Sequence, residues 1–392
     1  MVFLCLPYML PEALLPFLDT ATLGLIPALP GDKENFVHTF AVWWTLLWAI
    51  AFWTIFYAAL KNWGVRGWRL SLALAVFAVC SFGGTLRYHS ESPHYPMAVL
   101  ICSLNFVYIS TTFTKKPESN ACREWPELRE LRILPDMFER FFGLQVLLTD
   151  GAKRVAHMLG DESSADPRMR QVMLLFHPHS IFPVSHAALG LTSLWRSHFP
   201  HLSVNPLTAS IIHFVPVMRD VLQWLGICDV SKASVVNLIG MGRNVQIVCG
   251  GQTEMFESRS WDKEISVVRA RRLGVFKIAI QQGLGIVPIY SFGEPLTFDN
   301  IYMPRLQNFC KRVLGFPCPF VMLGQYGLPI PRRVPISVAV GEPVFPARQT
   351  ADPSLEEVKE FHRRYFEALQ ALFDQFKDQA GHGQCSIKWL DS

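Results

Sequence analysis

Two histidines flank a proline directly after a short apolar run, in the order His177, Pro178, His179, Ser180. Pro178 has a fixed φ and disfavours the α region for His177, so the chain is expected to turn out of a strand here. An imidazole with a pKa of about 6.5 suits removal of a proton from a hydroxyl group near neutral pH. The pattern predicts a general base, and the structural alternative is a pair of histidines that only pack in a loop.

A His-x-His pair can also chelate zinc. The third ligand would have to be His186, His213 or a carboxylate, and none of these stands at a diagnostic spacing. The nine cysteines include no CxxC pair, which favours free thiols in a reducing compartment over a zinc site or a disulfide scaffold. We therefore predict neither a metal nor a cofactor.

Further residues of chemical interest follow other apolar runs. Arg219 comes after FVPVM, and Glu254 comes after the glycine pair Gly250 and Gly251, while Pro288 lies inside GIVPIYSF. Paired glycines let backbone amides approach an oxyanion or a phosphate closely. A lone Arg or Glu is more often a solvated surface residue. These positions therefore indicate a functional site only if they lie together at the strand ends.

Arg271, Arg272 and Lys277 form a basic cluster that could hold the phosphates of CoA, or could simply be a solvated helix face. The net charge of +4 gives no sign of a nucleic-acid footprint. The sequence contains no P-loop, no dinucleotide fingerprint and no G-x-S-x-G nucleophile elbow.

Apolar runs alternate with helical patterns from residue 172 onward. The runs at 172–176, 211–217, 245–251, 285–292 and 335–341 predict strands, and the segments before residue 195, at 221–227 and at 272–283 predict helices. This alternation is typical of an α/β domain whose sheet is covered by helices on both faces. Ligands in such sheets bind where strands run into loops, which is where the residues above stand.

Two longer segments are also predicted to be helical. Residues 131–159 form an amphipathic pattern. Near the carboxyl end, apolar residues at helical spacing run from Leu355 to Phe376, with Asp352 or Ser354 available as the N-cap. This last helix is expected to dock on the core.

The amino-terminal part of the chain is strongly apolar. Residues 36–60 contain one histidine and no full charge. A helix rises about 1.5 Å per residue, so a helix of this length can cross a hydrocarbon core of roughly 30 Å. Shorter runs at 70–84 and 97–113 fit two further spans, a tilted pair or a re-entrant hairpin. Of the 392 residues 50% are hydrophobic and the mean hydropathy is +0.23, so we predict a retained membrane anchor.

Taken in order, these blocks resemble the glycerolipid acyltransferases, and more closely the type-2 diacylglycerol acyltransferase family, which includes monoacylglycerol and wax-alcohol acyltransferases. The His-Pro-His-Gly motif of that family is matched by HPHS (177–180), and a long block is matched by residues 271–294. The remaining matches are VGEP (340–343) and, in the last helix, His362, Tyr365, Leu369, Leu372 and Phe373. The resemblance covers about 120–378.

The resemblance implies a mixed α/β acyltransferase domain at 114–378, preceded by an N-terminal segment (1–35) and a transmembrane or re-entrant region (36–113), and followed by a tail (379–392). It implies attachment to the endoplasmic-reticulum membrane with the active site facing the cytosol, and lipid droplets as a second location. The donor would be acyl-CoA and the acceptor a neutral glycerolipid, with diacylglycerol esterified to triacylglycerol. The partners are then these substrates and the lipid bilayer, without nucleic acid, and a homo-oligomer is left open.

The predicted catalytic residues are His177, His179 and Glu254. His177 is preferred as the base because it is the first histidine of the block. Glu254 would orient the imidazole, because the Asp that the wider superfamily carries four residues after its histidine is replaced here. The predicted substrate-binding residues are Ser180, Arg219, Gly250, Gly251, Arg271, Arg272, Lys277 and Pro288.

Two departures from the family pattern and several alternatives accompany this prediction. Ser180 stands where the family has Gly, and residues 141–143 read Phe-Phe-Gly where it has Tyr-Phe-Pro. A second chemical route would pass through an acyl-enzyme on Ser180, Cys228 or Cys249. The alternative functions are a monoacylglycerol, wax-alcohol or lysophospholipid acyltransferase, or a membrane lipid-binding protein without catalysis.

Overall fold

The computed structural model describes residues 117–121, 123–214, 218–257, 264–300, 303, 305–307, 309, 322–328 and 330–390. Nearly all of them belong to one compact unit, formed by Pro117–His213, Met218–Phe309 and Pro317–Ser392. Within this described part, no helix is both long enough and apolar enough to cross a membrane. The predicted membrane segments at 36–60, 70–84 and 97–113 lie outside the described residues.

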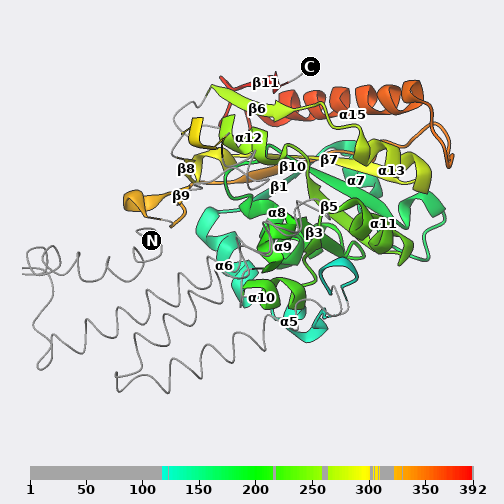
Figure 1. Ribbon diagram of the computed structural model, residues 1–392, viewed down its shortest axis with the longest axis horizontal. Coiled ribbons are helices and arrows are strands. Elements are labelled where there is room, and N and C mark those ends of the chain that lie inside the picture. The colour runs from blue at the N-terminus through cyan, green and yellow to red at the C-terminus, as the bar shows by residue number, and fades with distance from the viewer. Residues whose placement is uncertain are drawn as a thin grey trace, which may run out of the picture. The chain divides into compact units, whose positions relative to one another are not determined.

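A sheet of seven strands lies at the centre of the described unit, in the order β1-β10-β7-β2-β5-β3-β4 (Figure 1). The strands are β1 (Gln145–Leu148), β2 (Val172–His177), β3 (Val204–Thr208), β4 (Cys228–Asp229), β5 (Asn244–Val248), β7 (Gly285–Phe292) and β10 (Ser337–Val340). β10 is antiparallel to β7, and the other neighbouring strands are parallel. The predicted α/β class is confirmed, as are the strands predicted at 172–176, 245–251, 285–292 and 335–341.

Helices cover both faces of the sheet (Figure 1). One face carries α11 (Lys232–Gly240), α13 (Gly274–Gln282) and α15 (Leu355–Phe376), and the other carries α6 (Ile133–Phe142), α7 (Asp150–Val155), α8 (Val184–Ala188) and α9 (Ser193–His198). Shorter helices are α5 (Pro126–Glu130), α10 (Met218–Trp224) and α12 (Gly251–Glu257). The 3₁₀ turns include η5 (Ser210–Phe214) and η6 (Glu294–Leu296).

Alternate residues of β2 enter two separate hydrophobic clusters. Met173 and Leu175 belong to the cluster under α11, α13 and α15, whereas Val172, Leu174 and Phe176 belong to the cluster under α8 and α9. Successive side chains of a strand point to opposite faces, so a central strand with helices on both sides must be apolar throughout. This alternation also assigns the next odd residue, His177, to the face of α15.

The last helix forms as predicted. Ser354 is its N-cap, and its side chain and that of Glu357 form a reciprocal capping box. The apolar stripe of α15 is buried on the sheet. α13 also has the predicted C-cap, Gly283.

Two predicted elements are wrong. Residues 131–159 do not form one helix, because α6 ends at Phe142 and residues 145–148 form β1, which pairs with β10. The described part of the strand predicted at 211–217 is not a strand: η5 occupies 210–214, and the strand in this region is β3 at 204–208. Asn205 and Pro206 give β3 a composition that disfavours strands, and its position comes from pairing with β5.

Two strand pairs complete the unit. β6 (Ile265–Arg269) pairs in parallel with β11 (Ser386–Leu390), and β8 (Asp299–Asn300) pairs with β9 (Met322–Leu323). β11 lies inside the segment predicted as a C-terminal tail. Its pairing brings the end of the chain beside β6 and α15 (Figure 1).

Candidate active site

The His-Pro-His-Ser segment leaves the sheet at the carboxyl end of β2. His177 is the last residue of the strand and lies opposite Tyr290 of β7. Six residues (178–183) then connect the strand to α8. The two imidazoles on either side of Pro178 enter very different surroundings.

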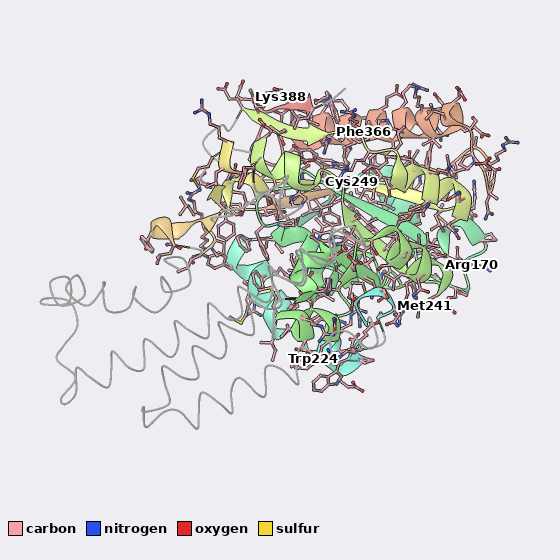
Figure 2. All side chains as sticks on the ribbon, in the orientation of Figure 1. Arg170, Trp224, Met241, Cys249, Phe366 and Lys388 are labelled. Carbon is pink, nitrogen blue, oxygen red and sulfur yellow. The ribbon has the colours of Figure 1, made fainter. Side chains whose placement is uncertain are left out.

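His177 is buried in the core. Its side chain is 0% exposed, and the ring lies against Tyr365 and Phe366 of α15, with centroid separations of 6.0 and 5.7 Å; Figure 2 labels Phe366 on this helix. Neither ring nitrogen has a hydrogen-bond partner among the described residues. Burial lowers the pKa of His177 to about 3. The ring is therefore neutral and enclosed by aromatic side chains.

His179 is held in one tautomer at the edge of the sheet. Its Nδ1 lies 2.6 Å from the carbonyl oxygen of Ser180, and because a carbonyl can only accept, Nδ1 must carry the proton. The lone pair is then on Nε2. Burial lowers the pKa of His179, and the nearby Arg272 acts in the same direction. A neutral imidazole with an unprotonated Nε2 has the form that a general base requires.

Glu254 binds the backbone of this loop. It lies in the first turn of α12, and its Oε1 accepts the backbone N–H of His179 at 2.5 Å while Oε2 accepts that of Arg269 at 3.2 Å. Burial raises the pKa of Glu254 to about 8, against the opposing effects of these two N–H donors and the guanidinium groups of Arg269 and Arg272. The carboxyl group contacts the main chain of His179, whereas we expected it to contact the ring.

The glycine pair makes this contact sterically feasible. A Cβ on Gly250 would lie 1.4 Å from Oε2 of Glu254, so only glycine leaves room for the carboxyl group. A Cβ on Gly251 would lie 2.8 Å from a guanidinium nitrogen of Arg272, which places that side chain directly against the loop. His179, Glu254, Arg272 and the two glycines therefore come together at the ends of β2 and β5.

Other predicted site residues lie elsewhere. Arg271 and Arg272 are both exposed; the Arg272 guanidinium lies against Gly251, whereas Lys277 on α13 is 3.9 Å from Asp352. The predicted basic cluster is therefore not a single patch around His179. Arg219 is buried in the first turn of α10 rather than at the end of a strand. Pro288 is buried inside β7 opposite Leu175, two residues before the register position of His177.

Ser180 fits the turn without strain. It has a negative φ, so the backbone does not require the glycine of the family pattern. Its hydroxyl donates to the carbonyl oxygen of Phe182 at 2.8 Å. The hydroxyl therefore stabilises the loop, and the side chain is buried.

Sequence reasoning missed Glu294 and named His186 only as a possible zinc ligand. His186 of α8 is buried, with Nε2 at 3.0 Å from the carbonyl oxygen of Gln246; burial lowers its pKa to about 4, and His179 contributes in the same direction. Glu294 is buried and accepts hydrogen bonds from α8. The available signal was that each residue follows shortly after the carboxyl end of a strand.

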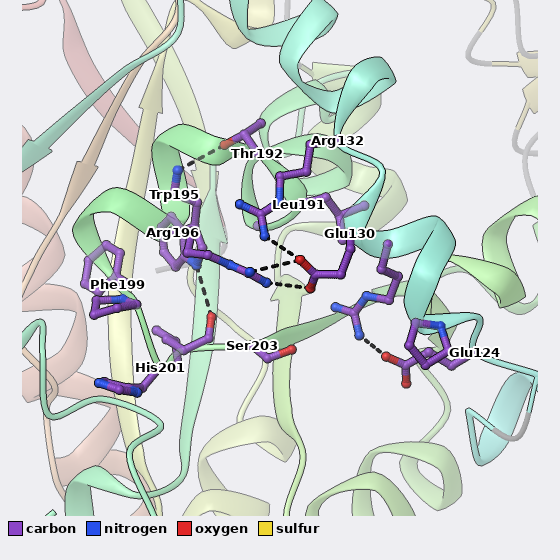
Figure 3. A pocket seen from close by; sticks show the side chains of 15 residues that line it. Glu124, Glu130, Arg132, Leu191, Thr192, Trp195, Arg196, Phe199, His201 and Ser203 are labelled. Atoms are coloured by element: carbon purple, nitrogen blue, oxygen red, sulfur yellow. Dashed lines mark hydrogen bonds and ion pairs between the residues drawn. The ribbon is translucent and has the colours of Figure 1, made fainter.

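A separate polar pocket of about 180 Å³ lies beside α5 and α9 (Figure 3). Its arginines are matched by carboxylates: Arg196 and Arg132 bind Glu130, and Arg129 binds Glu124. The lining includes none of the predicted site residues, all of which are in the described part of the chain. No group of three or more His, Cys, Asp or Glu that could hold a metal ion occurs among the described residues.

Comparison with known proteins gives a consistent family. The family model described as "Diacylglycerol acyltransferase" matches residues 161–386, a range that contains every predicted site residue. The chain is 33% identical over 244 residues to diacylglycerol O-acyltransferase 2A of Umbelopsis ramanniana, covering 57% of this chain and 66% of that protein. No solved structure matches this chain.

Two further relatives extend the comparison. Diacylglycerol O-acyltransferase 2 of Dictyostelium discoideum is 32% identical over 232 residues, covering 55% of this chain and 68% of the relative. Acyl-CoA wax alcohol acyltransferase 2 of Mus musculus is 32% identical over 229 residues, covering 54% and 67%. The chain spans just under two thirds of the length of the Umbelopsis relative. On the family match and these identities, the chain belongs to the diacylglycerol acyltransferase family.

Proposed function

We propose that this chain is an acyl-CoA-dependent O-acyltransferase that esterifies diacylglycerol to triacylglycerol. The observation that carries the proposal is the state of His179: Nδ1–H is fixed on the carbonyl of Ser180, which leaves Nε2 as a proton acceptor beside Arg272 and the Gly250–Gly251 loop. The donor and the class of acceptor are those named for the relatives.

In the proposed reaction, Nε2 of His179 takes the proton from the acceptor hydroxyl as its oxygen attacks the thioester carbonyl carbon. The C–S bond then breaks, and the CoA thiolate receives the proton from His179, which returns the imidazole to its neutral form. The negative charge on the carbonyl oxygen develops beside the Arg272 guanidinium and the backbone amides of the glycine pair, which are the groups suited to stabilise it.

The geometry favours direct transfer over an acyl-enzyme. A nucleophilic cysteine needs a lowered thiol pKa, yet burial raises the pKa of Cys228 and of Cys249 to about 12. The hydroxyl of Ser180 already donates to Phe182 and is not bound to the His179 ring nitrogen.

Ser180→Ala is expected to keep kcat/KM within about threefold of wild type, because it removes a loop hydrogen bond worth about 1 kcal/mol and no reacting atom. The measurement is transfer of a labelled acyl group from acyl-CoA to diacylglycerol in membranes, with Ser197→Ala on the exposed side of α9 as the matched control. An acyl-serine route would instead lose nearly all activity in Ser180→Ala. It would also leave labelled acyl group on the wild-type protein when the acceptor is omitted.

Attachment to the endoplasmic-reticulum membrane, with the His179 loop facing the cytosol, completes the proposal. The uncharged apolar run at 36–60 supports an anchor, and a lipid acceptor requires access to a bilayer or a lipid droplet. Protease protection of a tag after residue 392 in sealed microsomes tests the orientation, since a cytosolic domain is digested without detergent.

The acceptor is tested by expressing the chain in cells that lack neutral-lipid acyltransferases. Triacylglycerol formation is expected. Wax ester alone would indicate a wax-alcohol acyltransferase, and diacylglycerol alone would indicate a monoacylglycerol acyltransferase. New phospholipid would indicate a lysophospholipid acyltransferase. Acyl-CoA binding without turnover for any acceptor would identify a lipid-binding protein without catalysis.

A further inference from the structure

A second buried carboxyl group contacts the far end of the His179 loop. Glu294 begins η6, directly after β7, and its Oε1 accepts the backbone N–H of Ser185 at 3.0 Å. Its Oε2 accepts the hydroxyl of Ser185 and, at 2.6 Å, the hydroxyl of Ser291. Glu294 and Ser185 are each 1% exposed and Ser291 is 2% exposed, so water does not replace these bonds.

The backbone directs Glu294 toward α8. Gly293 has φ +84°, and a Cβ there would lie 2.3 Å from the carbonyl oxygen of Pro335, so the chain turns back sharply after β7. Ser291 follows Tyr290, the residue opposite His177 in the sheet. The cluster of Ser185, Ser291 and Glu294 therefore lies at the same sheet edge as the proposed base.

The loop between β2 and α8 is thus bound at both ends by buried carboxyl groups. Glu254 accepts the N–H of His179 near its start, and Glu294 accepts the N–H of Ser185 just after its end. Each glutamate follows a strand that pairs directly with β2, namely β5 for Glu254 and β7 for Glu294. The position of the loop relative to the sheet is consequently fixed from both neighbouring strands.

We propose that Glu294 is a positioning residue that fixes the start of α8 and thereby holds the His179 imidazole at its working distance from the acceptor hydroxyl. The inference rests on the proposed role of His179. Glu294 does not touch substrate, and its effect passes through Ser185 and the six-residue loop. A displacement of about 1 Å in a catalytic group can lower the rate about 100-fold.

The test compares Glu294→Ala, Glu294→Gln and Glu294→Asp in the full chain in membranes. Alanine is expected to lower kcat per folded molecule about 10- to 100-fold with little change in KM for acyl-CoA. Glutamine is expected to stay within about threefold of wild type, because its carbonyl accepts the Ser185 N–H and its amide donates to the two serine hydroxyls. Aspartate retains the carboxyl group but retracts the acceptor, so an intermediate kcat is expected even where alanine does not fold.

The pH profile separates positioning from a structural role. Burial lowers the pKa of His179, so a loosened and hydrated loop should shift the acid limb of kcat/KM upward, toward about 6.5. In Glu294→Ala that limb is expected to move up, and in Glu294→Gln it should remain in place.

Asp229→Ala is the matched control. Asp229 also is a buried carboxylate that accepts two serine hydroxyls, from Ser210 and Ser234, but it lies on β4, three strands from β2. It is expected to reduce the amount of folded protein and leave kcat per folded molecule and the pH profile unchanged. If Glu294→Ala and Glu294→Asp both behave like Asp229→Ala, the inference is wrong. Failure of the proposed function is seen separately, as full activity in His179→Ala.

Discussion

His179→Ala is expected to lower kcat/KM by about 10²- to 10⁴-fold, the usual contribution of a general base. His177→Phe is expected to retain activity within about threefold, because phenylalanine occupies the aromatic surroundings provided by Tyr365 and Phe366 and removes no accessible nitrogen. This pair of results would assign the base to the second histidine of the motif, although the sequence favoured the first.

The measurement is transfer of a labelled acyl group from acyl-CoA to diacylglycerol in membranes of cells without neutral-lipid acyltransferases, normalised to the amount of each variant. His157→Ala, at an exposed position on the same domain, is the matched control and should match wild type. Near-normal activity in His179→Ala would contradict the proposed mechanism. A loss in His177→Phe as large as in His179→Ala would contradict the assignment of His177 to the core.

His177 is also expected to make the folded protein sensitive to acid. Its pKa is about 3 in the folded state and about 6.5 when unfolded, so the unfolded chain binds the proton more tightly. The free energy of unfolding is therefore unaffected by this group above pH 6.5 and falls as the pH decreases toward 3. At pH 5 the loss from His177 is roughly 2 kcal/mol, because each pKa unit corresponds to about 1.4 kcal/mol.

His177→Phe should abolish this part of the pH dependence. The expected result is that wild type loses about 2 kcal/mol more than His177→Phe between pH 7 and pH 5. The free energy of unfolding is obtained from denaturant unfolding of the detergent-solubilised full chain, monitored by tryptophan fluorescence. His186 contributes its own acid sensitivity in both proteins, since burial lowers its pKa to about 4. Equal losses in wild type and variant would show that His177 is hydrated or hydrogen-bonded in the folded protein.

The fold class could be predicted because periodicity reflects burial. The runs at 172–176 and 285–292 lie at the centre of the sheet, where both faces are covered and most positions are apolar. The apolar stripe of α15 and its cap at Ser354 could also be predicted, because each depends on residues that are close together in the sequence.

The elements that were missed depend on distant pairing. β1 is a four-residue strand within an amphipathic segment, and only its pairing with β10 distinguishes it from helix. β3 contains Pro206, and β11 stands beyond the last helix where the sequence suggested a tail. In each case a long-range ladder outweighed the local propensity.

The sequence by itself determined the family, the α/β class and the group of residues from which the candidate site is drawn. The type and order of His-Pro-His, Gly-Gly-x-x-Glu and Val-Pro-Ile are properties of the chain alone. The spacing could not distinguish His177 from His179, and the preference for His177 came only from its place as the first histidine of the block.

Only the tertiary structure decided what surrounds each imidazole. Residues of α15, nearly two hundred positions later in the chain, cover His177 and exclude water from it. Glu254 binds the backbone of His179, and Glu294 binds the start of α8. Each glutamate follows a different strand that pairs with β2. The physical reason is that burial and hydrogen bonding, which set the pKa and the tautomer of a histidine, are properties of its surroundings in space.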